Sequence, residues 1–181
     1  LALGPYFTCG IKADDTVECW GLSNEGAANA PPGKFVIISA GYDFACGVKV
    51  GGEVVCWGDN SYGQTDAPAG TFGRVYSGYR HSCGAKLDGT IVCWGGDYTQ
   101  LAVPTGVFKE ATVGSGSICG IKVDGSLSCW GAFGGLSDVP AGNDFTSIAS
   151  GAHRVYALRS GGLIEGWFAP GCDASVDPLL P

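Results

Sequence analysis

The sequence is poor in charged residues, which make up 15% of its 181 residues, and it contains no methionine and only two histidines. No long run of like charge occurs, which excludes the compositions typical of a disordered chain or a coiled coil. No apolar run approaches the roughly 18 residues that a membrane-spanning helix needs, so we expect no membrane span. The net charge of −7 argues against nucleic acid as a partner.

Three further features are missing. Apolar residues do not recur at helical spacing, so we predict no helix and no glycine-rich phosphate loop that opens one. No Asn-x-Ser/Thr acceptor occurs, so N-glycosylation is not expected. There is no signal peptide, and together with the disulfides inferred below this leads us to expect a mature, secreted chain whose leader has been removed.

Glycine and cysteine are abundant, with 32 and nine residues. Both recur in a repeated segment, which runs Cys-Gly-Val-Lys-Val-Gly-Gly-Glu-Val-Val-Cys-Trp-Gly at residues 46–58. Its five copies are marked by tryptophans spaced 37, 37, 36 and 37 residues apart: Trp20, Trp57, Trp94, Trp130 and Trp167. A period of this length indicates a repeat architecture.

Each copy predicts a β-hairpin, because short apolar runs flank a turn. In the third copy, a three-residue loop at 87–89 makes Cys83 face Cys93 and puts Gly89 in the last loop position, which favours positive φ. A two-residue loop would point the two cysteines to opposite faces. The same loop position in the other copies holds Asp15, Gly52, Gly125 and Gly162.

Directly opposed residues of an antiparallel pair lie roughly 4.5–5.5 Å apart at Cα, a distance that a disulfide spans. The fifth copy replaces both cysteines together, with Tyr156 opposite Gly166, and a ring over a cross-strand glycine is a sensible substitute for the cross-link. We therefore predict four disulfides: Cys9–Cys19, Cys46–Cys56, Cys83–Cys93 and Cys119–Cys129.

Zinc binding is the alternative role for the cysteines, but it requires close Cys-x-x-Cys pairs and histidines, so we expect no metal and no cofactor. Cys172 is the ninth cysteine and lies outside the repeat pattern. For this residue we expect a free thiol, an intermolecular disulfide or a partner in a removed segment.

Short strands at even spacing predict an all-β fold: a β-propeller of about 37-residue repeats with five blades, spanning residues 1–181 as a single domain. Residues 1–4 align with 38–41, inside the strand whose next copy would begin near 178–181. We expect the propeller to be closed by pairing of its N- and C-terminal segments, because closure removes exposed sheet edges. An open arc, or a fragment of a larger ring, is the alternative.

Two segments carry a family resemblance. Residues 78–85, Gly-Tyr-Arg-His-Ser-Cys-Gly-Ala, resemble the Gly-x-x-His-x-x-x-Leu start of repeats in the regulator of chromosome condensation family. Residues 57–64, Trp-Gly-Asp-Asn-Ser-Tyr-Gly-Gln, resemble its Trp-Gly-x-Asn-x-x-Gly-Gln signature. The compact repeat is more similar to bacterial propellers that inhibit β-lactamases, and the cysteine pairs to the extracellular propellers of crinkly-type receptor kinases.

This resemblance implies a propeller fold, which in the family hosts nucleotide exchange on a small GTPase, enzyme inhibition and receptor recognition. Members are usually seven-bladed, so five repeats depart from the family pattern. Disulfides and an acidic composition fit poorly with a nuclear exchange role.

No Ser-His-Asp set or carboxylate pair repeats, so we do not predict an enzyme, although a site built from single loop residues is an alternative. We expect the tryptophans to pack between blades, and His81 to be structural because its column also holds phenylalanine. A column of basic residues either forms a charged ring or, as with Lys49 opposite Glu53, pairs across the hairpin. Its members are Lys12, Lys49, Lys86, Lys122 and Arg159.

The positions at which the repeats disagree are the ones that the fold does not explain. They follow one glycine of each repeat and comprise Pro5-Tyr6, Tyr42-Asp43, Tyr79-Arg80, Ser115-Gly116 and Ala152-His153. Loops on a rigid scaffold often carry recognition, and Tyr and Arg are favoured at binding hot spots. The candidate binding face is therefore Tyr42, Asp43, Tyr79, Arg80 and His153.

From these features we predict a secreted, extracellular, non-catalytic module that presents a rigid loop face to a protein or a glycan. One alternative is a structural subunit of an extracellular filament or homo-oligomer, joined through Cys172 or a donated N-terminal strand. Another is an inhibitor of an enzyme.

Overall fold

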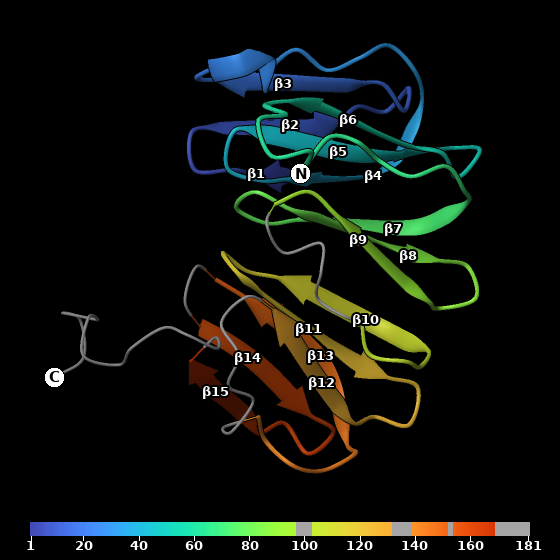
Figure 1. Cartoon of the computed structure of the whole chain (residues 1–181), viewed down its shortest axis with the longest axis vertical. Coiled ribbons are helices and arrows are strands. Elements are labelled where there is room, and N and C mark those ends of the chain that lie inside the picture. Colours follow the sequence, from blue (N-terminus) through green and yellow to red (C-terminus); the bar gives the residue numbers. More distant parts are fainter. Residues whose placement is uncertain (97–102, 132–138, 152–153, 169–181) are drawn as a thin grey trace, which may run out of the picture. The chain divides into compact units, whose positions relative to one another are not determined.

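The computed structural model describes residues 1–96, 103–131, 139–151 and 154–168 (Figure 1). Five three-stranded antiparallel sheets form, one for each repeat, with neighbouring strands consecutive in the chain. This confirms the all-β prediction and the assignment of one sheet to each repeat. Residues 178–181 lie outside the described part, so closure of the ends remains a prediction; Cys172 and His153 lie outside it as well.

The strands of the first three sheets are β1 (Ala2–Leu3), β2 (Phe7–Ile11), β3 (Val17–Gly21), β4 (Phe35–Ala40), β5 (Phe44–Lys49), β6 (Val54–Gly58), β7 (Phe72–Ser77), β8 (Ser82–Lys86) and β9 (Ile91–Trp94). Those of the last two are β10 (Phe108–Val113), β11 (Ser117–Lys122), β12 (Leu127–Gly131), β13 (Phe145–Ser150), β14 (Arg154–Arg159) and β15 (Ile164–Phe168). A short 3₁₀ turn, Asn24–Gly26, follows β3.

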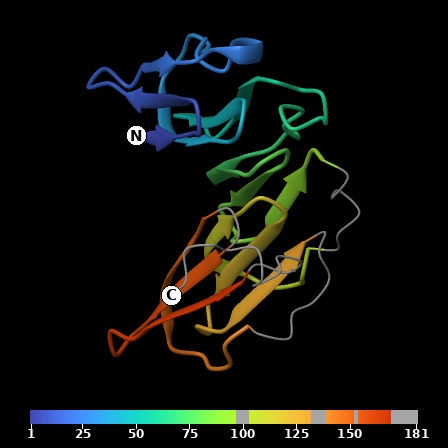
Figure 2. The same ribbon diagram turned by 90° about the vertical axis from the view of Figure 1, so that its left-hand side faces the viewer.

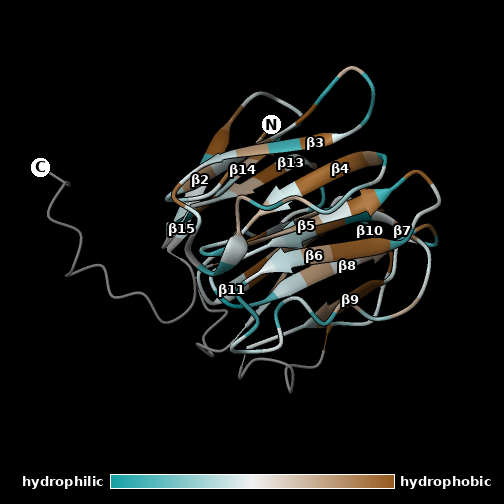
Figure 3. Ribbon diagram, turned by 90° about the horizontal axis from the view of Figure 1, so that it is seen from above, coloured by the Kyte–Doolittle hydropathy of each residue, from teal (hydrophilic) through white to brown (hydrophobic). Residues whose placement is uncertain are grey.

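The chain divides into two compact units, Leu1–Val103 and Pro104–Pro181. Within the first unit the sheets are layered, and β4–β6 lies between β1–β3 and β7–β9 (Figures 1 and 2). Within the second unit, β10–β12 packs against β13–β15. Hydrophobic residues lie mainly along the strands, and hydrophilic residues are concentrated in the loops (Figure 3).

The hairpin register is the one predicted from the cysteines. In the third repeat Cys83 pairs with Cys93 and Ala85 with Ile91, around a loop whose last residue, Gly89, has φ 81°. Asp88 Oδ1 in this loop accepts hydrogen bonds from the backbone N and Oγ1 of Thr90, at 2.9 and 2.7 Å, and these bonds lower the pKa of Asp88. The Asp-x-Thr/Ser pattern thus stabilises the turn by satisfying a backbone donor.

Four disulfides link the second and third strands of four repeats: Cys9–Cys19, Cys46–Cys56, Cys83–Cys93 and Cys119–Cys129. In the fifth repeat Tyr156 pairs with Gly166 in the same register. The ring of Tyr156 lies over this glycine, with Cε1 2.7 Å from the position that a Cβ on Gly166 would take.

The first strand of the second, third, fourth and fifth repeats carries a β-bulge that the sequence did not reveal. In the second repeat the register shifts between Phe35 and Ile37. The ring of the fully buried Phe35 lies over Gly47, with Cδ1 2.6 Å from the position that a Cβ on this glycine would take. Phe72 covers Gly84 in the same way. The glycine after the first cysteine is therefore required for packing.

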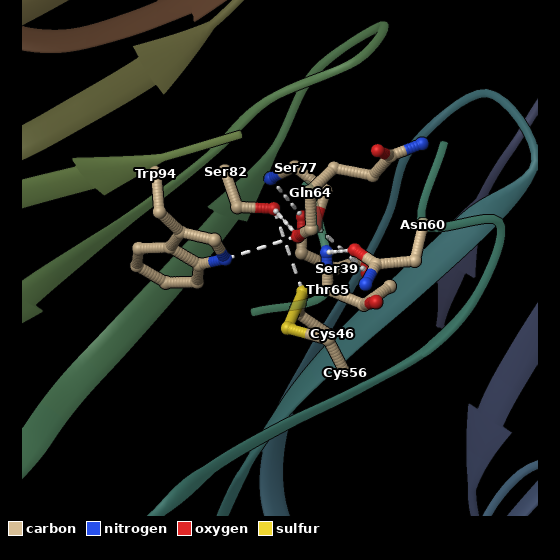
Figure 4. Close-up of a disulfide and its surroundings, with 9 residues drawn as sticks. All are labelled: Ser39, Cys46, Cys56, Asn60, Gln64, Thr65, Ser77, Ser82 and Trp94. Carbon is tan, nitrogen blue, oxygen red and sulfur yellow. Dashed lines mark hydrogen bonds between the residues drawn. A yellow bond between two sulfur atoms is a disulfide. The ribbon is translucent and has the colours of Figure 1, made fainter. Parts of the chain in front are cut away.

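The core lies between successive sheets of each unit. Cys46 packs with Phe44, Val48, Phe72 and Trp94, so the disulfide is part of the apolar interface between the second and third sheets. Figure 4 shows this disulfide, with Ser82 Oγ of the third sheet 3.5 Å from Cys46 Sγ. Trp57, Trp94, Trp130 and Trp167 are all buried, as expected for packing between blades. Trp20 differs, because it is 52% exposed.

Candidate functional site

Three tyrosines form a row on the loops between the first and second strands of the three sheets of the first unit. We call Tyr6, Tyr42 and Tyr79 the tyrosine row. The hydroxyls of Tyr6 and Tyr42 are 2.9 Å apart and hydrogen-bonded, and the two ring centroids are 5.3 Å apart in an edge-to-face arrangement. The rings of Tyr42 and Tyr79 are 4.5 Å apart. The row thus consists of side chains from three successive repeats that are far apart in the sequence and in contact in the structure.

The backbone of each loop is held by a short turn. In the second repeat Gly41 N donates to the carbonyl of Phe44 at 2.8 Å, and Gly4 and Gly78 make equivalent bonds to Phe7 and His81. Between these ends the side chains of Tyr6 and Tyr79 are exposed, whereas Tyr42 and Asp43 are half-buried. The repeat thus fixes where the row lies, while residue identity in the loops is free to vary.

Arg80 lies at one end of the row, between two aromatic rings. Its guanidinium carbon is 4.2 Å from the ring centroid of Tyr62 and 4.9 Å from that of Tyr79. Such cation–π contacts hold a guanidinium in place while leaving its N–H groups available. Nowhere in the described ranges does a hydrogen bond or ion pair reach the Arg80 side chain.

Tyr62 is held by the loop that follows β6. Its backbone N donates to Gln64 Oε1 at 2.8 Å, and the buried Gln64 also donates from Nε2 to Asp59 Oδ2 at 2.7 Å. The carbonyl oxygen of Gln64 accepts bonds from Ser82 Oγ and Trp94 Nε1 (Figure 4). The Asn-x-x-Gly-Gln signature therefore anchors this loop to the next sheet and places Tyr62 beneath Arg80.

Two carboxylates lie beside the row. Asp59 N donates to the carbonyl of Asp43 at 2.9 Å, which brings the two residues together. Burial acts to raise the pKa of Asp59, but hydrogen bonds from Ser61 and Gln64 and the charge of Arg80 lower it below its ordinary value. Asp43 differs: burial, and then the charge of Asp59, raise its pKa. Among the described residues, none donates a hydrogen bond to the Asp43 carboxylate.

The hydroxyl of Tyr42 stays protonated at neutral pH. Its hydrogen bond with Tyr6 and then burial raise the pKa of Tyr42 to about 12. Tyr42 therefore presents an aromatic ring and a neutral hydroxyl that can donate and accept hydrogen bonds. It offers a binding group rather than a group that exchanges protons near neutral pH.

The structure brings together four of the five predicted binding-face residues: Tyr42, Asp43, Tyr79 and Arg80. Sequence reasoning did not assign Tyr62 and Asp59 to the site. Both belong to the loop after the tryptophan of the preceding repeat, and the available signal was their place in the repeat signature.

The other candidates have local explanations. His81 is buried, and burial lowers its pKa to about 4, so it is neutral near pH 7. In the basic column Lys49 Nζ lies 3.3 Å from Glu53 Oε2, and Arg159 contacts Asp144 and Glu165.

No group of three or more His, Cys, Asp or Glu side chains suited to a metal occurs in the described part of the chain. No helix there is long and apolar enough to cross a membrane.

Comparison with known proteins supports the repeat assignment. The regulator of chromosome condensation (RCC1) repeat matches residues 35–64. The chain is similar to the crinkly WD40 ectodomain of the Arabidopsis thaliana receptor kinase ACR4, with TM-score 0.78 and 28% identity over 95% of this chain and 65% of that one. It is also similar to the ectodomain of the Physcomitrella patens receptor kinase CR4, with TM-score 0.76 and 24% identity over 93% of this chain and 49% of that one.

Prp20p from Saccharomyces cerevisiae, described with its binding to Gsp1p and histones, has TM-score 0.73 and 17% identity over 90% of this chain and 56% of that one. The chain thus spans about half to two thirds of the length of these three proteins. No curated protein sequence matches it. These similarities confirm the predicted resemblance and the β-propeller fold class, with one three-stranded blade for each of five repeats.

Proposed function

We propose that this chain, which resembles RCC1-type repeat proteins, is an extracellular, non-catalytic module that binds a protein. The binding surface consists of the tyrosine row, Arg80 and Asp43. The observation that carries the proposal is the contact of tyrosine rings from three successive repeats, with a stacked arginine at one end of the row.

The composition of this surface supports protein recognition. Tyr and Arg are the side chains most often found at energetic hot spots of interfaces, together with Trp. The rings already contact one another and Arg80 is already stacked, so few rotamers are lost when a partner binds. The disulfide-linked hairpins beneath the loops keep the surface preformed.

An extracellular location is supported by two observations. Four disulfides persist most readily in an oxidising compartment. Two of the similar proteins are receptor ectodomains. The protein class of the partner is supported by Prp20p, which is described with the proteins that it binds.

The proposal is tested by probing the immobilised chain with a displayed library of identified extracellular proteins. The test variant combines Tyr42→Ala and Tyr79→Ala. The matched control combines Val50→Ala and Leu87→Ala, which remove apolar side chains exposed by 63% and 77% from the hairpin tips of the same two repeats. These tips lie at the opposite ends of β5 and β8 from the tyrosines.

We expect partners whose binding is lost in the tyrosine variant and kept in the control. Partners that bind both variants equally would move the site elsewhere and contradict the proposal. A parallel glycan array is the test of the glycan alternative, and binding there without any protein partner would overturn the assignment to proteins. Light scattering tests the assembly alternative, for which a large particle that persists in reductant is the expected sign.

A further inference from the structure

The Arg80 arrangement has a counterpart one repeat earlier, in which the charge is reversed. Tyr42 and Tyr79 both follow the loop glycine, and the next residue is Asp43 in one repeat and Arg80 in the other. Tyr62, which lies under Arg80, is five residues after Trp57; the residue five after Trp20 is Glu25. The trio Tyr79, Arg80 and Tyr62 thus corresponds to Tyr42, Asp43 and Glu25.

In the later repeat the guanidinium belongs to the chain itself, at 4.2 and 4.9 Å from two tyrosine rings. In the earlier repeat the corresponding positions supply a tyrosine ring and two acidic residues, Asp43 and the exposed Glu25. No basic side chain of the described residues makes a cation–π contact with Tyr6 or Tyr42. Tyr42, Asp43 and Glu25 therefore provide the kinds of side chain that bind a cation.

We propose that Tyr42 and Asp43, with Tyr6 beside Tyr42 and Glu25 at the position equivalent to Tyr62, bind an arginine side chain of a basic segment in the partner protein. The inference rests on the proposed function and specifies the chemistry of the partner. The incoming guanidinium packs on the Tyr42 ring, as Arg80 packs on Tyr79, and donates hydrogen bonds to the Asp43 carboxylate.

Charge complementarity supports this occupant. Asp43 is partly buried and, within the described part, has no donor to its carboxylate, which is unfavourable for an ionised group. An arginine provides a planar fork of donors that matches a carboxylate, and it stacks on aromatic rings better than lysine does. The net charge of −7 would in addition increase the rate at which a basic segment associates.

The probe is a fluorescein-labelled peptide with three Gly-Ser-Arg-Gly-Ser units, and its reference is the same peptide with citrulline in place of arginine. Citrulline keeps the shape of the side chain and removes its charge. Fluorescence anisotropy with the full chain should show about tenfold tighter binding of the arginine peptide, from the combined cation–π and charge-assisted hydrogen bonds. A lysine peptide should bind with intermediate affinity.

Three variants locate the site. Asp43→Asn and Tyr42→Ala should each weaken binding of the arginine peptide by about tenfold, while Tyr42→Phe, which keeps the ring, should retain most of it. Glu18→Gln is the charge-matched control, because Glu18 is exposed on β3 and its loss changes the net charge by the same amount as Asp43→Asn. Circular dichroism confirms that each variant is folded.

Equal affinity for the arginine and citrulline peptides would overturn the inference. The inference would also be overturned if Asp43→Asn and Glu18→Gln reduced the affinity for the arginine peptide equally. That result would show that the peptide is attracted by the net charge of the chain alone. The library experiment separates the two proposals. Suppose that library partners depend on the tyrosines but bind equally well after their own basic residues are neutralised. This result would support the proposed function and refute the arginine site. Partners that ignore the tyrosines would refute the function itself.

Discussion

The indole Nε1 of Trp57 donates a hydrogen bond to the backbone carbonyl of Ala27 at 2.9 Å, across 30 residues of sequence. Trp94 makes the same bond to Gln64, also at 2.9 Å and across 30 residues. In each case the loop after one repeat accepts a bond from the indole of the next. In the second and third repeats, the tryptophan that marks the period of the sequence is thus also a side chain that joins neighbouring sheets.

This relationship predicts unequal effects of removing two equivalent indoles. Trp57→Ala should reduce the free energy of unfolding by about 3–5 kcal/mol, because it opens a cavity and leaves the Ala27 carbonyl without its donor. Trp20→Ala should cost less than about 1 kcal/mol, since that side chain is half exposed. Urea unfolding followed by far-UV circular dichroism measures both. Equal losses would contradict the exposed position of Trp20.

The fifth repeat should accept the cross-link that it lacks. Tyr156 and Gly166 pair in the register used by the cysteines of the other repeats. The double substitution Tyr156→Cys and Gly166→Cys should therefore form a disulfide and stabilise the chain by about 2–3 kcal/mol, as expected for a short closed loop. Non-reducing peptide mapping detects the bond, and thermal unfolding with and without reductant measures its effect. Tyr156→Cys alone is the control, and a bond from either new cysteine to Cys172 would contradict the prediction.

Two adjacent glycines of one hairpin loop should tolerate alanine differently. Gly52 has φ +85°, and a Cβ there would lie 2.5 Å from Cγ2 of Thr71, whereas a Cβ on Gly51 would meet nothing within 4 Å. Gly52→Ala should lower stability by about 1–2 kcal/mol, from the unfavourable left-handed backbone and the contact with Thr71. Gly51→Ala should stay within about 0.5 kcal/mol of wild type. Chemical denaturation of both variants is the measurement, and a reversed order would refute the turn geometry.

The proposed arginine site should lose affinity on acidification. Burial, and then the nearby charge of Asp59, raise the pKa of Asp43 above its ordinary value of 3.8, so its carboxylate takes up a proton at higher pH than an exposed aspartate does. Binding of the arginine peptide should therefore weaken as the pH falls through this raised pKa, while Asp43→Asn should show no such step. Hydrogen bonds from Ser61 and Gln64, and then the charge of Arg80, lower the pKa of the neighbouring Asp59, so that this group takes up its proton at a lower pH. An identical pH profile in the Asn variant would assign the titration to another group.

The same shift has a consequence for stability. The folded-state pKa of Asp43 lies above its unfolded value, so the folded state binds the proton more tightly and the Asp43 contribution to stability rises as the pH falls through that pKa. At neutral pH the ionised group is unfavourable for folding. We therefore expect Asp43→Asn to weaken binding without lowering the melting temperature at pH 7, which separates a binding role from a structural one.

The sequence by itself determined the hairpin register, the four cysteine pairs and the assignment of one sheet to each repeat. These features depend on local constraints, because the positive φ at Gly89 and the opposition of Cys83 and Cys93 are set within a single hairpin. Comparison of the five copies made those constraints visible. It also identified Tyr42, Asp43, Tyr79 and Arg80 as positions that the fold leaves free to vary.

Only the tertiary structure decided how those residues act together. The bulge after Phe35, the packing of its ring over Gly47 and the link from Trp57 to Ala27 all depend on how two sheets pack. The same packing brings Tyr62 beneath Arg80 and leaves the Asp43 carboxylate with no hydrogen-bond donor among the described residues. Contacts between residues of different repeats follow from the distance between sheets and the orientation of loops, and a period in the sequence does not specify either.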